Sequence, residues 1–285
     1  MDVFYLTCIV IGITAQNVLK KIYSKNNGKG VYFFNALTSF SAMLFFVVSA
    51  IVIKGKLNWN MSILPYSIAF AISFALSAIF SLTAISCGSL SLTSLIIQYS
   101  LLLPTFYGLL FLNDNISIGL IPGIILLLIS LILINKKSGG IMVSFKWIIS
   151  IFVAFLGNGM CSVVQKIQQI KFNGAYKDEF MIIALLVVCV IVGFLSVIKE
   201  RRGIIGYAKG GWYLGLVCGI MNGMVNLFVM ILSGLMPLSL MFPMISSGGI
   251  ITTYIVSKFI YKENLNKMQF IGFILGIGSI VLMNL

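Results

Sequence analysis

Neutral polar side chains stand at intervals inside long apolar stretches of this sequence, and they are the residues best placed to bind a ligand. An amide in lipid needs a hydrogen-bond partner, because without one its transfer from water is costly. Such side chains must therefore point into the protein. Asn222 and Asn226 are four residues apart and share one face of a helix. The candidate substrate-binding residues are Gln16, Gln98, Tyr99, Asn158, Asn222, Asn226, Ser246 and Ser247.

Together these amides and hydroxyls predict a central cavity that hydrogen-bonds a neutral or zwitterionic solute. Ser246 and Ser247 are followed by Gly248-Gly249, where the missing side chains let a backbone or a ligand approach closely. The alternative interpretation is that the polar residues hold helices together, as polar groups in membrane bundles often do. The sequence leaves both interpretations open.

Other kinds of chemistry have little support in the sequence. It contains no histidine, which is the commonest metal ligand and proton shuttle. The five cysteines are far apart and lie in or beside apolar stretches, which favours reduced packing residues. All six acidic residues fall in predicted termini or loops. We therefore expect no catalytic residues, no bound metal and no cofactor, and we expect the protein not to be an enzyme.

Three lysines lie where predicted helices meet the membrane interface: Lys20, Lys21 and Lys166. Long cationic side chains in this position normally extend toward the lipid headgroups, which is the favoured interpretation. If one of them turned inward instead, it would favour a substrate that carries a carboxylate or phosphate group.

The elements that position these residues follow from eight stretches without any charged residue. About 20 apolar residues in a helix cross a hydrocarbon core of about 30 Å. Two stretches are too long for one crossing and have a break near the middle, at Cys87-Gly88-Ser89 and at residues 233–237, so ten helices are predicted. The stretches are 3–19, 31–53, 57–113, 115–135, 147–165, 180–198, 210–257 and 268–285.

Composition supports a membrane protein. Hydrophobic residues make up 60% of the chain and charged residues only 9%, far below the share of about 25% that soluble domains carry. The long runs of apolar residues exclude a barrel and predict helices. The net charge of +13 comes from lysines and arginines near the ends of predicted helices, where they meet anionic lipid, so nucleic acid is not an expected partner.

The two halves of the chain echo each other. The order of single and double stretches is the same in each half, and individual residues match at offsets between 145 and 149. Lys21-Ile22 matches Lys166-Ile167, and Leu90-Ser91-Leu92 matches Leu238-Ser239-Leu240. An odd number of crossings per half places the second half upside down in the bilayer. We therefore predict an all-α integral membrane protein whose ten transmembrane helices form two inverted five-helix repeats, residues 1–139 and 140–285.

The repeat pattern resembles the drug/metabolite transporter superfamily, in its EamA-like branch, over nearly the whole chain. The resemblance rests on Pro237-Leu238-Ser239 before the ninth helix, Pro243 within it, Tyr261-Lys262-Glu263-Asn264 after it, and the glycines from Gly272 to Gly278. It implies a carrier of small metabolites. The stretch Gly12 to Gln16 also resembles small multidrug and lipid-flippase relatives. Gln16 stands in the region where the multidrug relatives carry a glutamate, which argues against proton-coupled export of cationic drugs.

The expected function is secondary transport of a small polar organic metabolite by alternating access. Flipping of a lipid-linked sugar or amine and a membrane scaffold without transport are the alternatives. Expected partners are a small-molecule substrate and membrane lipid, with a homodimer left open. The expected location is the cell membrane. Its orientation is open, since the distribution of lysines and arginines favours both termini outside and the resemblance implies both inside.

Overall fold

The computed structural model describes residues 2–27, 30–55, 57–112, 144–201, 203–262 and 267–283, with scattered positions between 118 and 133. All regular elements in these ranges are helices. The first half contains α1 (Asp2–Asn27), α2 (Val31–Lys54), η1 (Met61–Ile63), α3 (Leu64–Cys87), α4 (Leu90–Gln98), η2 (Tyr99–Leu101) and α5 (Leu102–Phe111). The second contains α7 (Phe145–Lys171), α8 (Lys177–Lys199), α9 (Ile204–Lys209), α10 (Trp212–Ser233), α11 (Leu238–Ile260) and α12 (Lys267–Met283).

Seven of the described helical stretches are long and apolar enough to cross a membrane, and two shorter apolar ones lie in α11 and α12. The chain is therefore an all-α membrane protein. Both predicted breaks are confirmed, since α3 ends at Cys87 before α4 begins at Leu90, and α10 ends at Ser233 before α11 begins at Leu238. The predicted helix over 115–135 lies largely outside the described residues, as do Asp114 and Glu263.

Two helices extend well past the limits that charge alone set. The charge-free stretches end at residues 19 and 165, whereas α1 continues to Asn27 and α7 to Lys171. The lysines near these limits are satisfied inside the protein. The Lys21 ammonium donates to the carbonyls of Ile85 and Gly88, and that of Lys166 donates to the carbonyl of Ser233. Both lysines thus cap the C-terminal end of a neighbouring helix, where the helix dipole favours a cation.

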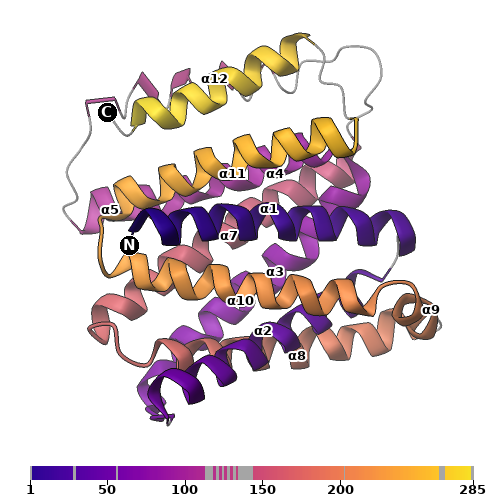
Figure 1. The fold of residues 1–285 in the computed structure, drawn as a ribbon, viewed down its shortest axis with the longest axis vertical. Coiled ribbons are helices and arrows are strands. Elements are labelled where there is room, and N and C mark those ends of the chain that lie inside the picture. The colour runs from indigo at the N-terminus through magenta and orange to yellow at the C-terminus, as the bar shows by residue number, and fades with distance from the viewer. Residues whose placement is uncertain are drawn as a thin grey trace.

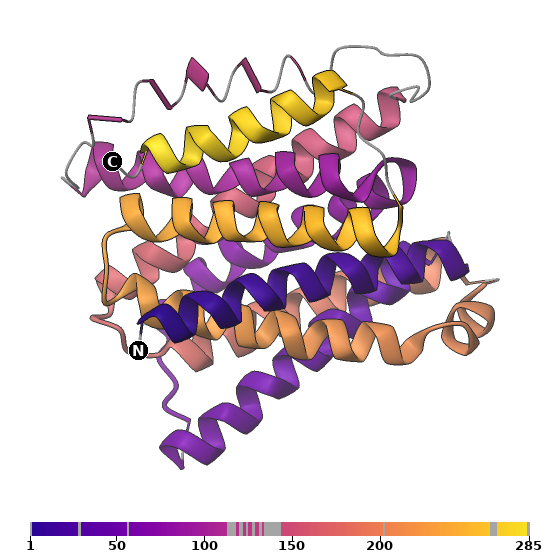
Figure 2. The same cartoon turned by 45° about the horizontal axis from the view of Figure 1, so that its top comes forward.

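The helices lie side by side, with α12 at one edge of the bundle and α2 and α8 at the other (Figures 1 and 2). In both views α1 lies between α11 and α10, which it contacts along its length. Much of the core lies where α2, α3, α8 and α10 meet, around buried Phe46, Phe70 and Phe180. The helices that carry most of the candidate residues are therefore central, and those that carry few of them lie at the edges.

The fourth predicted helix is interrupted by the 3₁₀ turn η2. Pro104 has no amide hydrogen to donate to the carbonyl of Ser100, four residues earlier, which weakens the α-helical pattern at this point. The amide of Leu102 bonds to the carbonyls of Tyr99 and Ser100. The carbonyl of Gln98 accepts a hydrogen bond from the Ser246 hydroxyl at 2.8 Å. Ser246 thus links α11 to the end of α4, next to the interruption.

Three of the acidic residues are buried at helix ends, which their assignment to loops did not indicate. They are Asp178, Glu179 and Glu200. The two carboxylate oxygens of Glu200 accept hydrogen bonds from the backbone amides of Tyr32 and Phe33, at 2.9 and 2.8 Å. Glu200 thereby caps the first turn of α2 from the end of α8, with a charge that suits a helix N-terminus.

Replacing Glu200 by alanine is expected to lower the free energy of unfolding by about 2–3 kcal/mol, because two charge-assisted hydrogen bonds are lost and two amides stay buried. Thermal unfolding of the purified protein in detergent measures the effect. Arg201→Ala is the control, since Arg201 is exposed and adjacent. Equal melting temperatures for the two variants would show that the cap contributes nothing.

Candidate functional site

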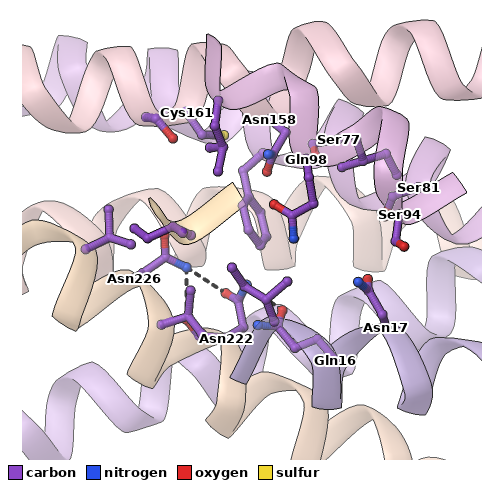
Figure 3. Close-up of a pocket in the computed structure, with 18 of the residues that line it drawn as sticks. Gln16, Asn17, Ser77, Ser81, Ser94, Gln98, Asn158, Cys161, Asn222 and Asn226 are labelled. Carbon is purple, nitrogen blue, oxygen red and sulfur yellow. Dashed lines mark hydrogen bonds between the residues drawn. The ribbon is translucent and has the colours of Figure 1, made fainter. Parts of the chain in front are cut away.

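A cavity of about 130 Å³ lies at the centre of the bundle, lined by α1, α3, α4, α7, α10 and α11 and by Leu101 of η2. A single water needs about 10–15 Å³, so the cavity has room for a small solute. Five of the eight predicted residues line it: Gln16, Gln98, Asn158, Asn222 and Asn226. Helices from both halves of the chain therefore bring these amides to one place (Figure 3).

The other three predicted residues are not part of the lining described for this cavity. The Tyr99 hydroxyl lies 3.1 Å from the Ser130 hydroxyl, and Tyr99 is buried. Ser246 is buried and donates to the Gln98 carbonyl, so it holds α11 against α4. Ser247 belongs to α11, but its side chain lies outside the described part of the structure. The described contacts of Tyr99 and Ser246 are with other segments of the protein, because a polar residue that faces inward can meet another helix instead of a space.

Four amides form a connected chain across the cavity wall. The side-chain amide of Gln165 donates to the side-chain oxygen of Asn226 at 2.8 Å, and Asn226 donates to the side-chain oxygen of Asn222 at 3.1 Å. Asn222 in turn donates to the side-chain oxygen of Gln16 at 3.1 Å. These bonds link α7, α10 and α1. The same amides thus hold helices together and line the cavity, so the two interpretations of the polar residues are compatible at this site.

Gln98 differs from the other amides. Its side chain is only 5% exposed and lines the cavity, and it makes no hydrogen bond to any residue that the structure describes. A Cβ atom on Gly249 would lie 2.5 Å from the Gln98 side-chain nitrogen, so the absence of a side chain at Gly249 makes room for this amide. A buried amide that faces a cavity without a protein partner is available to a ligand.

Several cavity residues were not among the predicted set. Asn17, Ser77, Ser81 and Ser94 gave no signal beyond being polar within a predicted helix, although Ser77 and Ser81 share a face of α3. Helical spacing places Gln165 and Lys20 on the same stripes as Asn158 and Gln16, although neither was among the candidate binding residues. In Figure 3, Asn17, Ser81 and Ser94 lie toward one end of the cavity and Asn226 toward the other.

Lys20 contradicts the favoured expectation that it extends to the headgroups. Its ammonium donates to the hydroxyl of Ser81, a buried residue of α3, at 3.1 Å. Among the lining residues that the structure describes, Lys20 is the one with a charge, and none carries a carboxylate. Among the described residues there is also no group of three metal-ligating side chains. The arrangement can therefore donate and accept hydrogen bonds and can attract negative charge.

Comparisons with known proteins inform the fold. No family model and no curated protein matches the chain. Among solved structures 28 chains match. One of them, a crystal structure of a protein, is 12% identical and aligns over 97% of this chain and 95% of its own length with a TM-score of 0.61. At this identity the similarity shows a shared fold across nearly the entire chain, and nothing about its ligand.

Proposed function

We propose that this protein is a secondary transporter that moves a small polar organic metabolite by alternating access. The observation that carries the proposal is the central cavity lined by amides from both halves of the chain, with Gln98 available to a ligand. A binding site at the interface of two halves near the membrane midplane is typical of secondary carriers. A membrane scaffold would be expected to have a fully packed centre.

The proposal includes ten transmembrane helices in two inverted repeats of the EamA-like kind. Contacts made by two glycines support it. A Cβ atom on Gly12 would lie 2.5 Å from Val225, and one on Gly157 would lie 2.9 Å from Ser77. Gly157 follows Gly12 by 145 residues, and Val225 follows Ser77 by 148. Equivalent residues of α1 and α7 thus pack on equivalent residues of α10 and α3, each in the opposite half.

The hydrogen bonds by which Lys21 and Lys166 cap helix ends support the proposed repeat within each half. Lys166 follows Lys21 by 145 residues, and their acceptors Ser233 and Ile85 differ by 148. The first helix of each half therefore caps the third helix of that half at corresponding positions. Rocking of α1–α5 against α7–α12 about such a pseudo-symmetric interface would open the cavity to each side of the membrane in turn.

Binding to the purified protein tests the proposal. The melting temperature is measured in mild detergent against amino acids, amines, nucleotide sugars and phosphorylated metabolites, because a ligand specific to the folded state raises it. A compound that gives a saturable rise is then tested for counterflow in liposomes. Saturable binding followed by counterflow supports a transporter. Binding without counterflow, or the absence of any saturable rise, contradicts it.

Replacing Asn222 by alanine is expected to abolish counterflow and to lower the free energy of unfolding by about 1–3 kcal/mol, because Gln16 and Asn226 each lose a partner. Asn35→Ala is the matched control. Asn35 is a buried asparagine of α2 outside the cavity lining, whose amide donates to the carbonyl of Val31. Normal counterflow by Asn222→Ala would mean that the amide chain takes no part in transport.

A further inference from the structure

We infer that the transported or bound molecule carries an anionic group, a carboxylate or a phosphate, and that Lys20 binds it at the end of the cavity where Ser81 lies. This inference rests on the proposed function, since it names the class of ligand for the same cavity. It departs from the neutral or zwitterionic solute that the amides alone predict.

The position of the Lys20 ammonium is fixed by its bond to Ser81. Ser81 is 4% exposed and belongs to the wall of the cavity. The bond of 3.1 Å from the ammonium to its hydroxyl therefore holds the charge at the cavity wall. In Figure 3 Ser81 lies at the same end as Asn17 and Ser94, so further hydrogen-bonding groups surround this position.

None of the described residues that line the cavity is acidic, so none of them neutralises the charge at this position. The Lys20 ammonium can donate three hydrogen bonds, and the described residues accept only one of them, at Ser81. Two of the described acidic residues have hydrogen-bond partners elsewhere. Glu200 accepts from backbone amides at the start of α2, and Glu179 accepts from the backbone amide of Asn58. A cation in a membrane interior is costly and marks a functional site by default.

The neighbouring lysine shows that a purely structural role has a different geometry. Lys21 donates to two backbone carbonyls at the end of α3, which use its charge to complete a helix terminus. Lys20 meets a single neutral hydroxyl within α3. An anionic group of a ligand would supply the opposite charge and the two acceptors that Lys20 lacks, in a cavity of low dielectric where such a pair is strong.

Gln98 extends the inference to the remainder of the ligand. Its free amide lines the same cavity but comes from α4, so it can bind a second polar group of a molecule whose anionic end lies at Lys20. The amide chain from Gln165 to Gln16 lines another part of the wall. The ligand is thus a small anion with at least one further hydrogen-bonding group, and a simple cation is excluded by charge.

The test compares charged probes with uncharged probes of similar shape. The purified full-length protein is titrated with succinate and succinamide, and with glycerol 3-phosphate and glycerol, while its melting temperature is followed. Phosphatidic acid against phosphatidylcholine in the micelles forms a third pair, which distinguishes a lipid headgroup from a soluble anion. We expect the anionic member of at least one pair to raise the melting temperature and its uncharged or zwitterionic partner not to do so.

Variants separate the charge of Lys20 from its contact with Ser81. Lys20→Gln keeps a hydrogen-bond donor for Ser81 and loses the charge, and Lys20→Met loses both. In each we expect the apparent affinity for the anionic probe to fall at least about tenfold. Lys25→Met is the matched control. Lys25 is an exposed lysine of the same helix, and its ammonium lies over the ring of Tyr261. This variant should bind the anionic probe as the unmodified protein does.

Each outcome decides between the possibilities. The inference is supported if an anionic probe binds to the unmodified protein and to Lys25→Met but not to Lys20→Gln. If phosphatidic acid is the only anionic probe that binds, the anionic group belongs to a lipid headgroup. Equal binding of charged and uncharged probes, or full binding by Lys20→Gln, overturns the anionic site while leaving the transporter proposal standing. If none of these probes binds but an uncharged compound shows counterflow, the inference is again overturned; if no compound binds or shows counterflow, both fail.

Discussion

Gln98→Leu is expected to weaken ligand binding by at least about fivefold and to reduce transport accordingly, while the protein remains folded. The Gln98 amide is buried, faces the cavity and has no hydrogen-bond partner among the described residues. Leucine of similar size removes the amide without breaking any hydrogen bond that the structure describes for this side chain. A ligand group that then stays unpaired in the cavity loses about 1–3 kcal/mol, which corresponds to a five- to hundredfold weaker affinity.

The stability of the variant distinguishes this role from a structural one. Because no described hydrogen bond of the side chain is lost, Gln98→Leu should melt at the temperature of the unmodified protein or above it. Gln168→Leu is the matched control. Gln168 is a fully buried glutamine of α7 outside the cavity lining, and its amide donates to the carbonyl of Ala175 at 2.8 Å. The Gln168→Leu variant should lose stability and keep its ligand affinity. A Gln98→Leu variant that loses stability and keeps its ligand affinity would refute the assignment of Gln98 to the binding site.

Gly157→Val is expected to have a large effect on folding. A Cβ atom at this position would lie 2.7 Å from the carbonyl oxygen of Ser73 and 2.9 Å from the amide nitrogen of Ser77. These are backbone atoms of α3, so the contact can be relieved only by separating α7 from α3. Overpacking of this kind costs about 1–3 kcal/mol and more where the backbone cannot move. The yield of monodisperse protein on size-exclusion chromatography and its melting temperature measure the loss.

Variants at two further glycines should have smaller effects on stability and serve as comparisons. At Gly12 the nearest atom to an added Cβ is a methyl carbon of Val225, which can move more easily than backbone, so Gly12→Val should be damaging but less so than Gly157→Val. At Gly193 a Cβ would meet nothing within 4 Å, and Gly193→Val should be tolerated. A Gly157→Val protein as stable as Gly193→Val would show that α3 and α7 do not pack as closely as described.

Both predictions concern features that the sequence could only partly reveal. The pattern of apolar, charge-free stretches located the long helices that the structure describes and both breaks, since the length of an apolar stretch and the turn residues within it are local properties. It misplaced the ends of α1 and α7, because Lys20, Lys21 and Lys166 were taken as markers of the interface. Their actual acceptors lie on α3 and α10, more than 60 residues away in the chain.

The sequence by itself determined that this is a helical membrane protein and that its mid-helix amides must face inward, because lipid offers them no hydrogen bonds. Only the tertiary structure decided which inward-facing residues meet a cavity and which meet another helix. Gln98 lines the cavity, where the missing side chain of Gly249 leaves room for its amide, whereas Tyr99, the next residue, meets Ser130. Lys20 lies on the cavity wall for the same reason, since its direction is set by Ser81 on α3 and not by its neighbours in sequence.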